Sequence, residues 1–416
     1  MIRPTQSLSE KVAQQPRKFF YGWMIVAVCT LMIGITYGLM YSYSVFFKPL
    51  ADYFSWDRAT VSVVYSVSLI IRGTFAVGVG WLADRYGPVK LSIFCGVMIA
   101  LGLVLASRAT DLWQFFFTYA VIEAIGLSGA FGIGTAMVSR WFTKNRGLAL
   151  GIVSTGSGLG TLFIVPGNER LISALGWSTA FLVCGITAGV VMIATAFLLR
   201  FPPSNTPPAH VHPAGHAAGI SPTEATLASA LKDTRMMLLL GVFLLFFFCN
   251  QIIMVHLVNY ATDIGIAPLI AATFISIIGA ISIGGRLSAG AGSERIGINN
   301  TLILTHVFLV VSLVGLIFIR PLWSFYTFAV VFGFTYGAEV PLIPLFVGRF
   351  FGTRSMATIV GLVLFIGNIG GALGPWLAGK IYDATQAYHW AFIVGAIAAA
   401  VSLSLALTLK RQSRVR

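Results

Sequence analysis

Long apolar runs separated by short polar intervals dominate the chain. Twelve of these runs are long enough to cross a bilayer, which takes about 20 residues of α-helix. The runs are continuous rather than alternating, which favours helices over strands, and helices satisfy their own backbone groups in lipid. The predicted spans are 20–47, 58–83, 90–107, 112–139, 147–167, 177–200, 236–263, 267–291, 299–319, 321–348, 355–380 and 388–409.

The longest interval between apolar runs divides the chain into two groups of six. It covers roughly 201–235 and is rich in Pro, His, Ala and Ser, which is typical of a linker. We therefore predict an all-α integral membrane protein with twelve transmembrane helices in two six-helix bundles. The predicted segments are an N-terminal tail (1–19), a first bundle (20–200), a linker (201–235), a second bundle (236–410) and a C-terminal tail (411–416).

Charge and composition fit this picture. The chain is 57% hydrophobic and only 10% charged, which excludes a soluble globular protein. Lysine and arginine concentrate in the tails, the linker and the loops on one side, so by the positive-inside rule both termini face the cytoplasm. The net charge of +14 follows this loop pattern and does not indicate nucleic-acid binding. We expect a monomeric, multi-pass protein of the plasma membrane (the cell inner membrane), surrounded by the lipid bilayer.

The residues give no sign of an enzyme, a cofactor or a metal site. No small-residue cleavage site follows the first run, which therefore reads as a retained helix. The glycine-rich stretches 156–160 and 367–375 lie within spans and lack the strand-to-helix context of a phosphate loop. The cysteines all fall inside apolar runs and suggest neither a disulfide framework nor zinc spacing: Cys29, Cys95, Cys184 and Cys249.

The two halves repeat. "GWLADRYGPVK" (80–90) ends the second span and "GAGSERIG" (290–297) ends the eighth, with an offset of 210 residues between Asp84 and Glu294. "RWFTKNRGLALGI" (140–152) and "RFFGTRSMATIVG" (349–361) precede the fifth and eleventh spans with an offset of 209. Parallel six-helix repeats predict a site at mid-membrane between two bundles.

These motifs resemble a known family. Gly80, Asp84, Arg85, Gly87 and Lys90 match the G-x-x-x-D-R-x-G-x-x-K signature of the major facilitator superfamily, and "SERIG" is a degenerate echo. The resemblance implies that this family's fold applies. We expect Asp84, Arg85 and Lys90, with Glu294 and Arg295 in the echo, to form a gating charge network at the cytoplasmic end.

A finer resemblance concerns the stretch "WFTKNRGLALG" (141–151), which is similar to a signature of the monocarboxylate transporters. The first span and its end, 22–50, also resemble the first helix of that family. The chain is identified as a bacterial member of the monocarboxylate transporters, related to the oxalate/formate antiporters, which carry a similar stretch.

Arg286 is the most informative single residue. It lies inside the eighth predicted span, roughly 12 Å deeper than Glu294 along the same helix. A charge at that depth costs from about 2.5 kcal/mol upward and usually faces a cavity or a partner. A guanidinium is a planar fork that matches a carboxylate. We expect Arg286 to bind the carboxylate of a substrate, with a structural ion pair as the alternative. The resemblance implies the substrate role.

The chain departs from the family at the groups that usually carry the proton. Ser282 stands where relatives have an aspartate one turn before the arginine, and Tyr41 stands where they have a lysine in the first helix. The seventh span offers a polar stripe at helical spacing instead. We expect Asp263 and His256 to take part in proton coupling with Arg286. The alternatives are that Asp263 only ends its helix and that His256 is a packing residue.

Other polar side chains within the spans form a second group of candidates. Their hydroxyl and amide groups could bond a substrate hydroxyl or keto oxygen, although packing between helices is the alternative for each. The candidate substrate-binding residues beside Arg286 are Tyr37, Tyr41, Tyr119, Tyr336 and Asn259.

Arg72 is the other arginine deep within a predicted span. No family motif includes it, so we favour a structural role, with Glu123 and Glu339 neutralising its charge.

Together these residues predict a secondary transporter that moves a small monocarboxylate, of the lactate or pyruvate type, with a proton. The eleventh span (361–379) contains no lysine, which argues against a dicarboxylate. One anion carried with one proton is electroneutral. The alternatives are an organic-anion exchanger of the oxalate/formate type, a drug/proton exporter and a membrane sensor.

Overall fold

The computed structural model describes residues 21–142, 146–201, 227–352 and 356–413. The expected N-terminal tail (1–19), most of the expected linker and the last residues of the C-terminal tail lie outside the described residues. Within the described ranges the regular structure is helical, as the apolar runs predict.

The first half of the chain forms the first bundle. One membrane span is built from four consecutive short segments, one of which is π-helical. The elements are α2 (Tyr21–Phe54), α3 (Arg58–Tyr86), α4 (Pro88–Ala106), α5 (Leu112–Phe115), the π-helical η1 (Phe116–Glu123), α6 (Ala124–Leu127), α7 (Ala130–Trp141) and α8 (Arg146–Ala196).

The second half forms the second bundle. After the short α9 (Leu227–Ala230) come α10 (Thr234–Asp263), α11 (Pro268–Gly292), the π-helical η2 (Ser293–Gly297), α12 (Ile298–Phe318), α13 (Leu322–Phe351), α14 (Met356–Thr385) and α15 (His389–Gln412).

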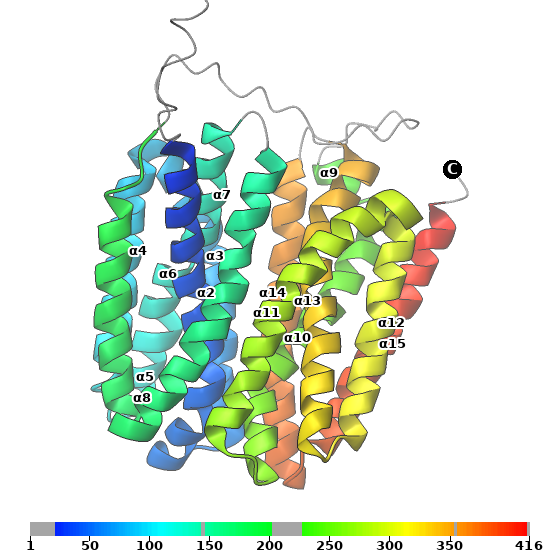
Figure 1. Ribbon diagram of the computed structural model, residues 1–416. Helices are drawn as coiled ribbons and strands as arrows, with labels where there is room; N and C mark the ends of the chain where they lie inside the picture. The colour runs from blue at the N-terminus through cyan, green and yellow to red at the C-terminus, as the bar shows by residue number, and fades with distance from the viewer. Residues whose placement is uncertain (1–20, 143–145, 202–226, 353–355, 414–416) are drawn as a thin grey trace, which may run out of the picture.

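The described residues contain 11 helices of membrane-spanning length and composition, one fewer than the sequence predicts. The difference is α8, whose 51 residues would extend about 77 Å as one helix, more than twice the hydrocarbon core of about 30 Å. Gly176 breaks α8 with φ 79° and ψ 162°, a backbone conformation that glycine adopts readily. In Figure 1 the start of α2 and the end of α15 lie at the same end of the molecule. An even number of crossings is therefore required, and the two arms of α8 supply it.

Short polar signals set the helix ends. The Asp57 carboxylate accepts a hydrogen bond from Thr60 N at 2.7 Å and begins α3. Asp233 does the same for Arg235 N at 2.8 Å and begins α10. Such caps satisfy amide groups that the helix leaves free. We call the end that carries the start of α2 and the end of α15 the inner end, and the opposite end the outer end.

Glycines let the helices within each bundle approach closely. A Cβ added at Gly160 of α8 would lie 1.8 Å from the Gly34 carbonyl oxygen of α2. In the second half, a Cβ at Gly374 of α14 would lie 2.4 Å from the Phe248 carbonyl oxygen of α10. Small residues are the usual contact between membrane helices. The two halves thus use the same device at equivalent helix pairs.

The two bundles meet along α3 with α14, α8 with α11, and α2 with α10. Glycines lie at these contacts too: a Cβ at Gly158 of α8 would lie 2.4 Å from the Gly279 carbonyl oxygen of α11. A Cβ at Gly73 of α3 would lie 2.9 Å from the Asn368 amide of α14. At these points the helices of the two bundles therefore approach closely, because glycine has no side chain to separate them.

Candidate functional site

Arg286 lies in α11 and reaches from the second half of the chain to the first. Its Nη1 donates a hydrogen bond to the backbone carbonyl of Ser154 in α8. Its Nε is buried and has no hydrogen-bond partner among the described residues. None of the ion pairs within the described ranges includes Arg286. The guanidinium is therefore only partly satisfied by protein groups.

Three of the predicted tyrosines gather near the contact between the halves. The Tyr41 hydroxyl of α2 and the Tyr336 hydroxyl of α13 are joined by a hydrogen bond of 2.8 Å. The Tyr37 ring lies 6.1 Å from the Tyr41 ring, centroid to centroid. Tyr37 also lies within electrostatic range of both Arg286 and Arg72. The structure thus brings Tyr37 within electrostatic range of the predicted carboxylate-binding arginine, with Tyr41 packed on Tyr37 and bonded to Tyr336.

Tyr119 and Asn259 have other neighbours. Tyr119 is 3% exposed, and its ring lies 5.6 Å from Phe115 and 5.1 Å from Tyr43, within the first half. Asn259 is 1% exposed and donates to the Val255 carbonyl of its own helix at 2.9 Å. A substrate role for either residue stays a prediction.

The expected pairing of Glu339 with Arg72 is wrong. Glu339 Oε1 instead contacts His306 Nδ1 at 3.0 Å and accepts from Thr305 Oγ1 at 2.5 Å, both in α12. The reason is that Glu339 faces the interior of the second bundle, while Arg72 belongs to α3 of the first. Glu123 does interact electrostatically with Arg72.

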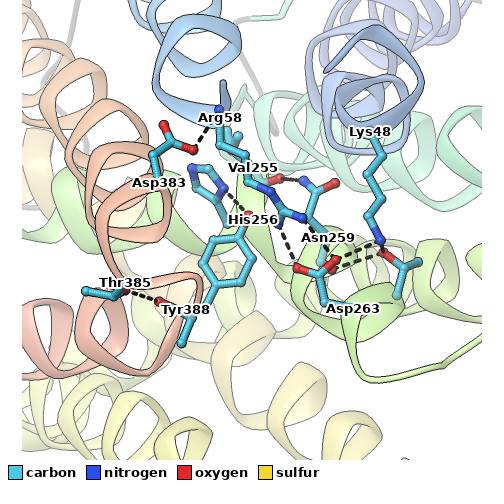
Figure 2. A network of polar contacts seen from close by, with 11 residues as sticks. Lys48, Arg58, Val255, His256, Asn259, Asp263, Asp383, Thr385 and Tyr388 are labelled. Carbon is cyan, nitrogen blue, oxygen red and sulfur yellow. Dashed lines mark hydrogen bonds and ion pairs between the residues drawn. The ribbon is translucent and has the colours of Figure 1, made fainter. Parts of the chain in front are cut away.

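Asp263 lies at the outer end of α10, where two cations of the first half bind it (Figure 2). Arg58 of α3 makes a two-pronged contact, Nη1 to Oδ2 at 2.7 Å and Nη2 to Oδ1 at 3.0 Å. Lys48 Nζ of α2 lies 2.7 Å from Oδ1. Asp263 is therefore occupied by Arg58 and Lys48, while Arg286 bonds to α8. The predicted proton role of Asp263 stays a prediction, and its structural role is plain.

A second carboxylate completes this outer ion-pair cluster, by which we mean Lys48, Arg58, Asp263, Asp383 and Tyr388. Asp383 of α14 accepts hydrogen bonds from the first amides of α3, Arg58 N at 3.0 Å and Ala59 N at 2.7 Å. Arg58 Nη1 also donates to the Tyr388 hydroxyl at 2.6 Å. The cluster thus joins two helices of the first bundle to the second bundle at the outer end.

His256 is fully buried beside this cluster (Figure 2). Its Nε2 lies 2.9 Å from the Pro375 carbonyl oxygen, which can only accept, so Nε2 carries a proton. Its Nδ1 lies 3.0 Å from the Tyr388 hydroxyl. Burial raises the pKa of Tyr388, so this hydroxyl keeps its proton and can donate to Nδ1. Both ring nitrogens of a neutral His256 are therefore satisfied, which supports the packing alternative. Its proton role stays a prediction.

The predicted gating residues lie at the inner end. Arg85, Lys90, Glu294 and Arg295 are exposed, and the Arg85 guanidinium carbon lies 5.6 Å from the Tyr86 ring centroid. The side chain of Asp84 lies outside the described set. Neither Glu294 nor Arg295 enters an ion pair in the described ranges. Within the described ranges, the ion pairs that join the halves lie at the outer end.

Sequence reasoning missed Lys48, Arg58 and Asp383 as functional candidates. The available signal was the scarcity of cations on the outer side, where a basic residue opposes the general charge bias. Lys48 and Arg58 flank the first outer loop and are such exceptions. Their partner cannot be deduced from spacing, because 205 positions separate Arg58 from Asp263.

Comparisons with known proteins agree with this architecture. The model of the Major Facilitator Superfamily matches residues 26–375. Monocarboxylate transporter 12 of Rattus norvegicus is 28% identical over 427 residues, covering 95% of this chain and 87% of the relative. Monocarboxylate transporter 13 of the same organism is 28% identical over 384 residues, covering 90% and 85%. Monocarboxylate transporter 11 of Homo sapiens is 26% identical over 383 residues, covering 90% of this chain and 80% of the relative.

Solved structures resemble the fold. A bacterial homolog of the human lysosomal transporter Spinster, in an inward-facing and unoccupied conformation, matches with a TM-score of 0.72 at 16% identity, covering 95% of this chain and 98% of that one. The nucleoside transporter NupG matches with a TM-score of 0.73 at 14% identity, covering 92% and 99%. At these identities the likeness concerns the fold alone.

Proposed function

The chain belongs to the Major Facilitator Superfamily, and from this premise we propose that it carries a small monocarboxylate, of the lactate or pyruvate type, together with a proton. It is a multi-pass secondary transporter distantly related to the monocarboxylate transporters. We further propose that it works as a monomer in the plasma membrane.

One observation carries the proposal: the Arg286 guanidinium offers a buried Nε donor that no described protein group accepts. A carboxylate has two acceptor oxygens with the spacing of a guanidinium fork. A substrate anion could take Nε and a second nitrogen at once. The hydroxyls of Tyr41 and Tyr336 are bonded to each other, and Tyr41 packs on Tyr37, which lies within electrostatic range of Arg286. They suit the hydroxyl or keto oxygen of a lactate-type acid.

The location of Arg286 supports a transport cycle. Its bond to Ser154 crosses the contact between α11 and α8, which belong to different halves. An anion that takes Nη1 competes with the Ser154 carbonyl, and one that takes Nε and Nη2 binds beside that bond. Substrate binding is thereby linked to the contact between the bundles, which alternating access requires to change.

The test is transport by purified protein in proteoliposomes. We expect labelled lactate to enter by counterflow, and an inward proton gradient to drive its accumulation. Arg286→Lys keeps the charge but loses the fork, a loss of about 1.5–3 kcal/mol or roughly ten- to a hundredfold in apparent affinity. Arg108→Lys, at an exposed loop position, is the matched control. Wild-type transport by Arg286→Lys would rule out the carboxylate role.

A second candidate, exchange of oxalate-type dianions, is favoured by one observation. Tyr37 lies within electrostatic range of Arg72 as well as Arg286, so a second cation is near the candidate site. Competition by lactate, pyruvate, acetate, formate and oxalate in the same counterflow assay separates the two. Stronger competition by oxalate than by lactate would favour the dianion.

A further inference from the structure

Glu123 is an intramembrane carboxyl group that the proposed substrate site does not use. It ends η1 in the fourth span and is 1% exposed. Both of its carboxyl oxygens are buried without a hydrogen-bond partner among the described residues. An ionised carboxylate in this setting is costly, whereas a protonated carboxyl group is neutral. Glu339 is equally buried, and among the described residues it has partners on Oε1 and none on Oε2.

The backbone that holds Glu123 is unusual. η1 is π-helical over Phe116–Glu123, a form found mostly as single-turn insertions at functional sites. The internal repeat shows the insertion: Leu112 corresponds to Leu322 at an offset of 210, but Arg140 corresponds to Arg349 at an offset of 209. The fourth span therefore contains one residue more than the tenth, within the stretch where the π-helical segment lies.

Charged and titratable groups face Glu123 from the neighbouring helices. α3 contributes Arg72, which interacts electrostatically with Glu123, and Tyr65. η1 itself contributes Tyr119, whose ring packs on Tyr43 of α2. α4 meets the segment with Gly102, where an added Cβ would lie 2.6 Å from Glu123 N. The described ion pairs do not include Arg72. Arg72 is thus the cation available to an ionised Glu123.

We propose that Glu123 is the proton-binding residue of the transport cycle and that it controls the charge of Arg72. This inference rests on the proposed function. It assigns the proton to Glu123 instead of to Asp263 and His256 of the seventh span. When Glu123 binds a proton it becomes neutral, and the positive charge of Arg72 is uncompensated. When Glu123 releases the proton, its carboxylate compensates Arg72, and the pair is neutral.

This arrangement links the proton to the anion. Arg72 and Arg286 both lie within electrostatic range of Tyr37, one from each half. A protonated Glu123 leaves an uncompensated positive charge near the site, and a substrate anion is attracted to it. When the anion leaves, the charge of Arg72 has to be compensated by the Glu123 carboxylate. Glu123 must therefore release its proton. One anion and one proton therefore move together, and no net charge crosses.

The decisive variant is Glu123→Gln in proteoliposomes, with two readouts. Glutamine cannot release a proton, so we expect lactate counterflow without a pH gradient to persist and accumulation driven by a pH gradient to be lost. Accumulation at the wild-type level overturns the inference, and so does loss of counterflow. If the wild-type protein transports no lactate in either assay, it is the proposed function that fails.

Glu339→Gln is the matched control, because Glu339 is an equally buried carboxyl group in the other half. We expect it to keep gradient-driven accumulation. Loss of accumulation in Glu339→Gln, alone or together with Glu123→Gln, overturns the assignment to Glu123.

If Glu123→Gln does not fold, Glu123→Asp keeps a carboxyl group on a shorter side chain farther from Arg72. We then expect coupled transport with a shifted midpoint in its pH profile, and an unchanged midpoint overturns the inference.

Discussion

At the scale of single residues, the polar groups within the spans divide by whether the protein satisfies them. His256 has a partner for each ring nitrogen, and Asn259 bonds to its own helix. Arg286 Nε and both oxygens of Glu123 have none among the described residues. Buried groups without partners are costly in lipid. A ligand bound to Arg286 or a proton bound to Glu123 therefore changes the free energy of the protein more than binding to a satisfied group would.

Tyr336 offers a prediction at this scale. Tyr336→Phe removes the hydroxyl that bonds Tyr41 at 2.8 Å but keeps the ring. Losing one neutral hydrogen bond costs about 1 kcal/mol, or roughly fivefold in affinity. We expect this loss for lactate and a smaller one for acetate, which has no hydroxyl group. Inhibition constants from counterflow measure the ratio, with Tyr326→Phe of the same helix as the control. Equal losses for both acids would remove Tyr336 from hydroxyl recognition.

The side chains of the candidate site were partly predictable. Arg286, Tyr37, Tyr41 and Tyr336 stand out in the sequence because polar residues are rare in apolar spans. Whether a given polar residue is already satisfied depends on neighbours from other helices. His256 is a candidate by its position, yet Tyr388 bonds its Nδ1, and Glu339 was expected to neutralise Arg72, yet His306 contacts its Oε1.

At the scale of the helices, glycine decides how closely two elements approach. Gly102 of α4 lies against the last turn of η1, and Gly132 of α7 has open space around it. The two positions therefore offer the same substitution in contrasting surroundings.

Gly102→Ala is expected to destabilise the protein. The new methyl group would lie 2.6 Å from Glu123 N and 2.7 Å from its Cα, so η1 must move. Overpacking of this kind costs about 1–3 kcal/mol. Gly132→Ala meets nothing within 4 Å and is expected to gain up to about 1 kcal/mol of helix propensity. Thermal unfolding of both variants in detergent checks this, and similar melting temperatures would contradict the close contact.

Helix positions followed from the sequence, whereas their irregularities did not. The apolar runs predicted every span, and the break between the fifth and sixth spans lies at Gly176, as their expected ends of 167 and 177 imply. The π-helical form of η1 was not predicted, because side chains of ordinary helical character fill it. The drop in repeat offset from 210 to 209 was its only trace in the sequence.

At the scale of the whole molecule, the outer ion-pair cluster holds the two bundles together at one end. Asp263 of the second half contacts two cations of the first, and Asp383 caps a helix of the first. The fold was predictable because apolar runs mark each span. The ion pairs at the outer end were not predictable, because residues so far apart in the chain share no periodic signal.

Asp263→Asn is expected to open the outer end. The substitution leaves Lys48 and Arg58 without their shared carboxylate, so the closed arrangement loses its attraction and gains repulsion between two cations. Spin labels at Thr110→Cys and Arg320→Cys, on outer loops of opposite halves, report the separation, since the native cysteines are buried. We expect the distance to increase in Asp263→Asn and to stay unchanged in Asp52→Asn. An unaltered distance in Asp263→Asn would show that other contacts close the outer end.

The bond from Arg286 to the Ser154 carbonyl has a kinetic consequence. It joins α11 to α8, and it must break before α11 can leave α8. An anion that takes Nη1 frees the loaded carrier from this bond, so that the carrier without substrate meets the higher barrier to reorientation. We expect one-for-one exchange of label to run faster than net uptake, with the return of the vacant binding site setting the pace of the full cycle.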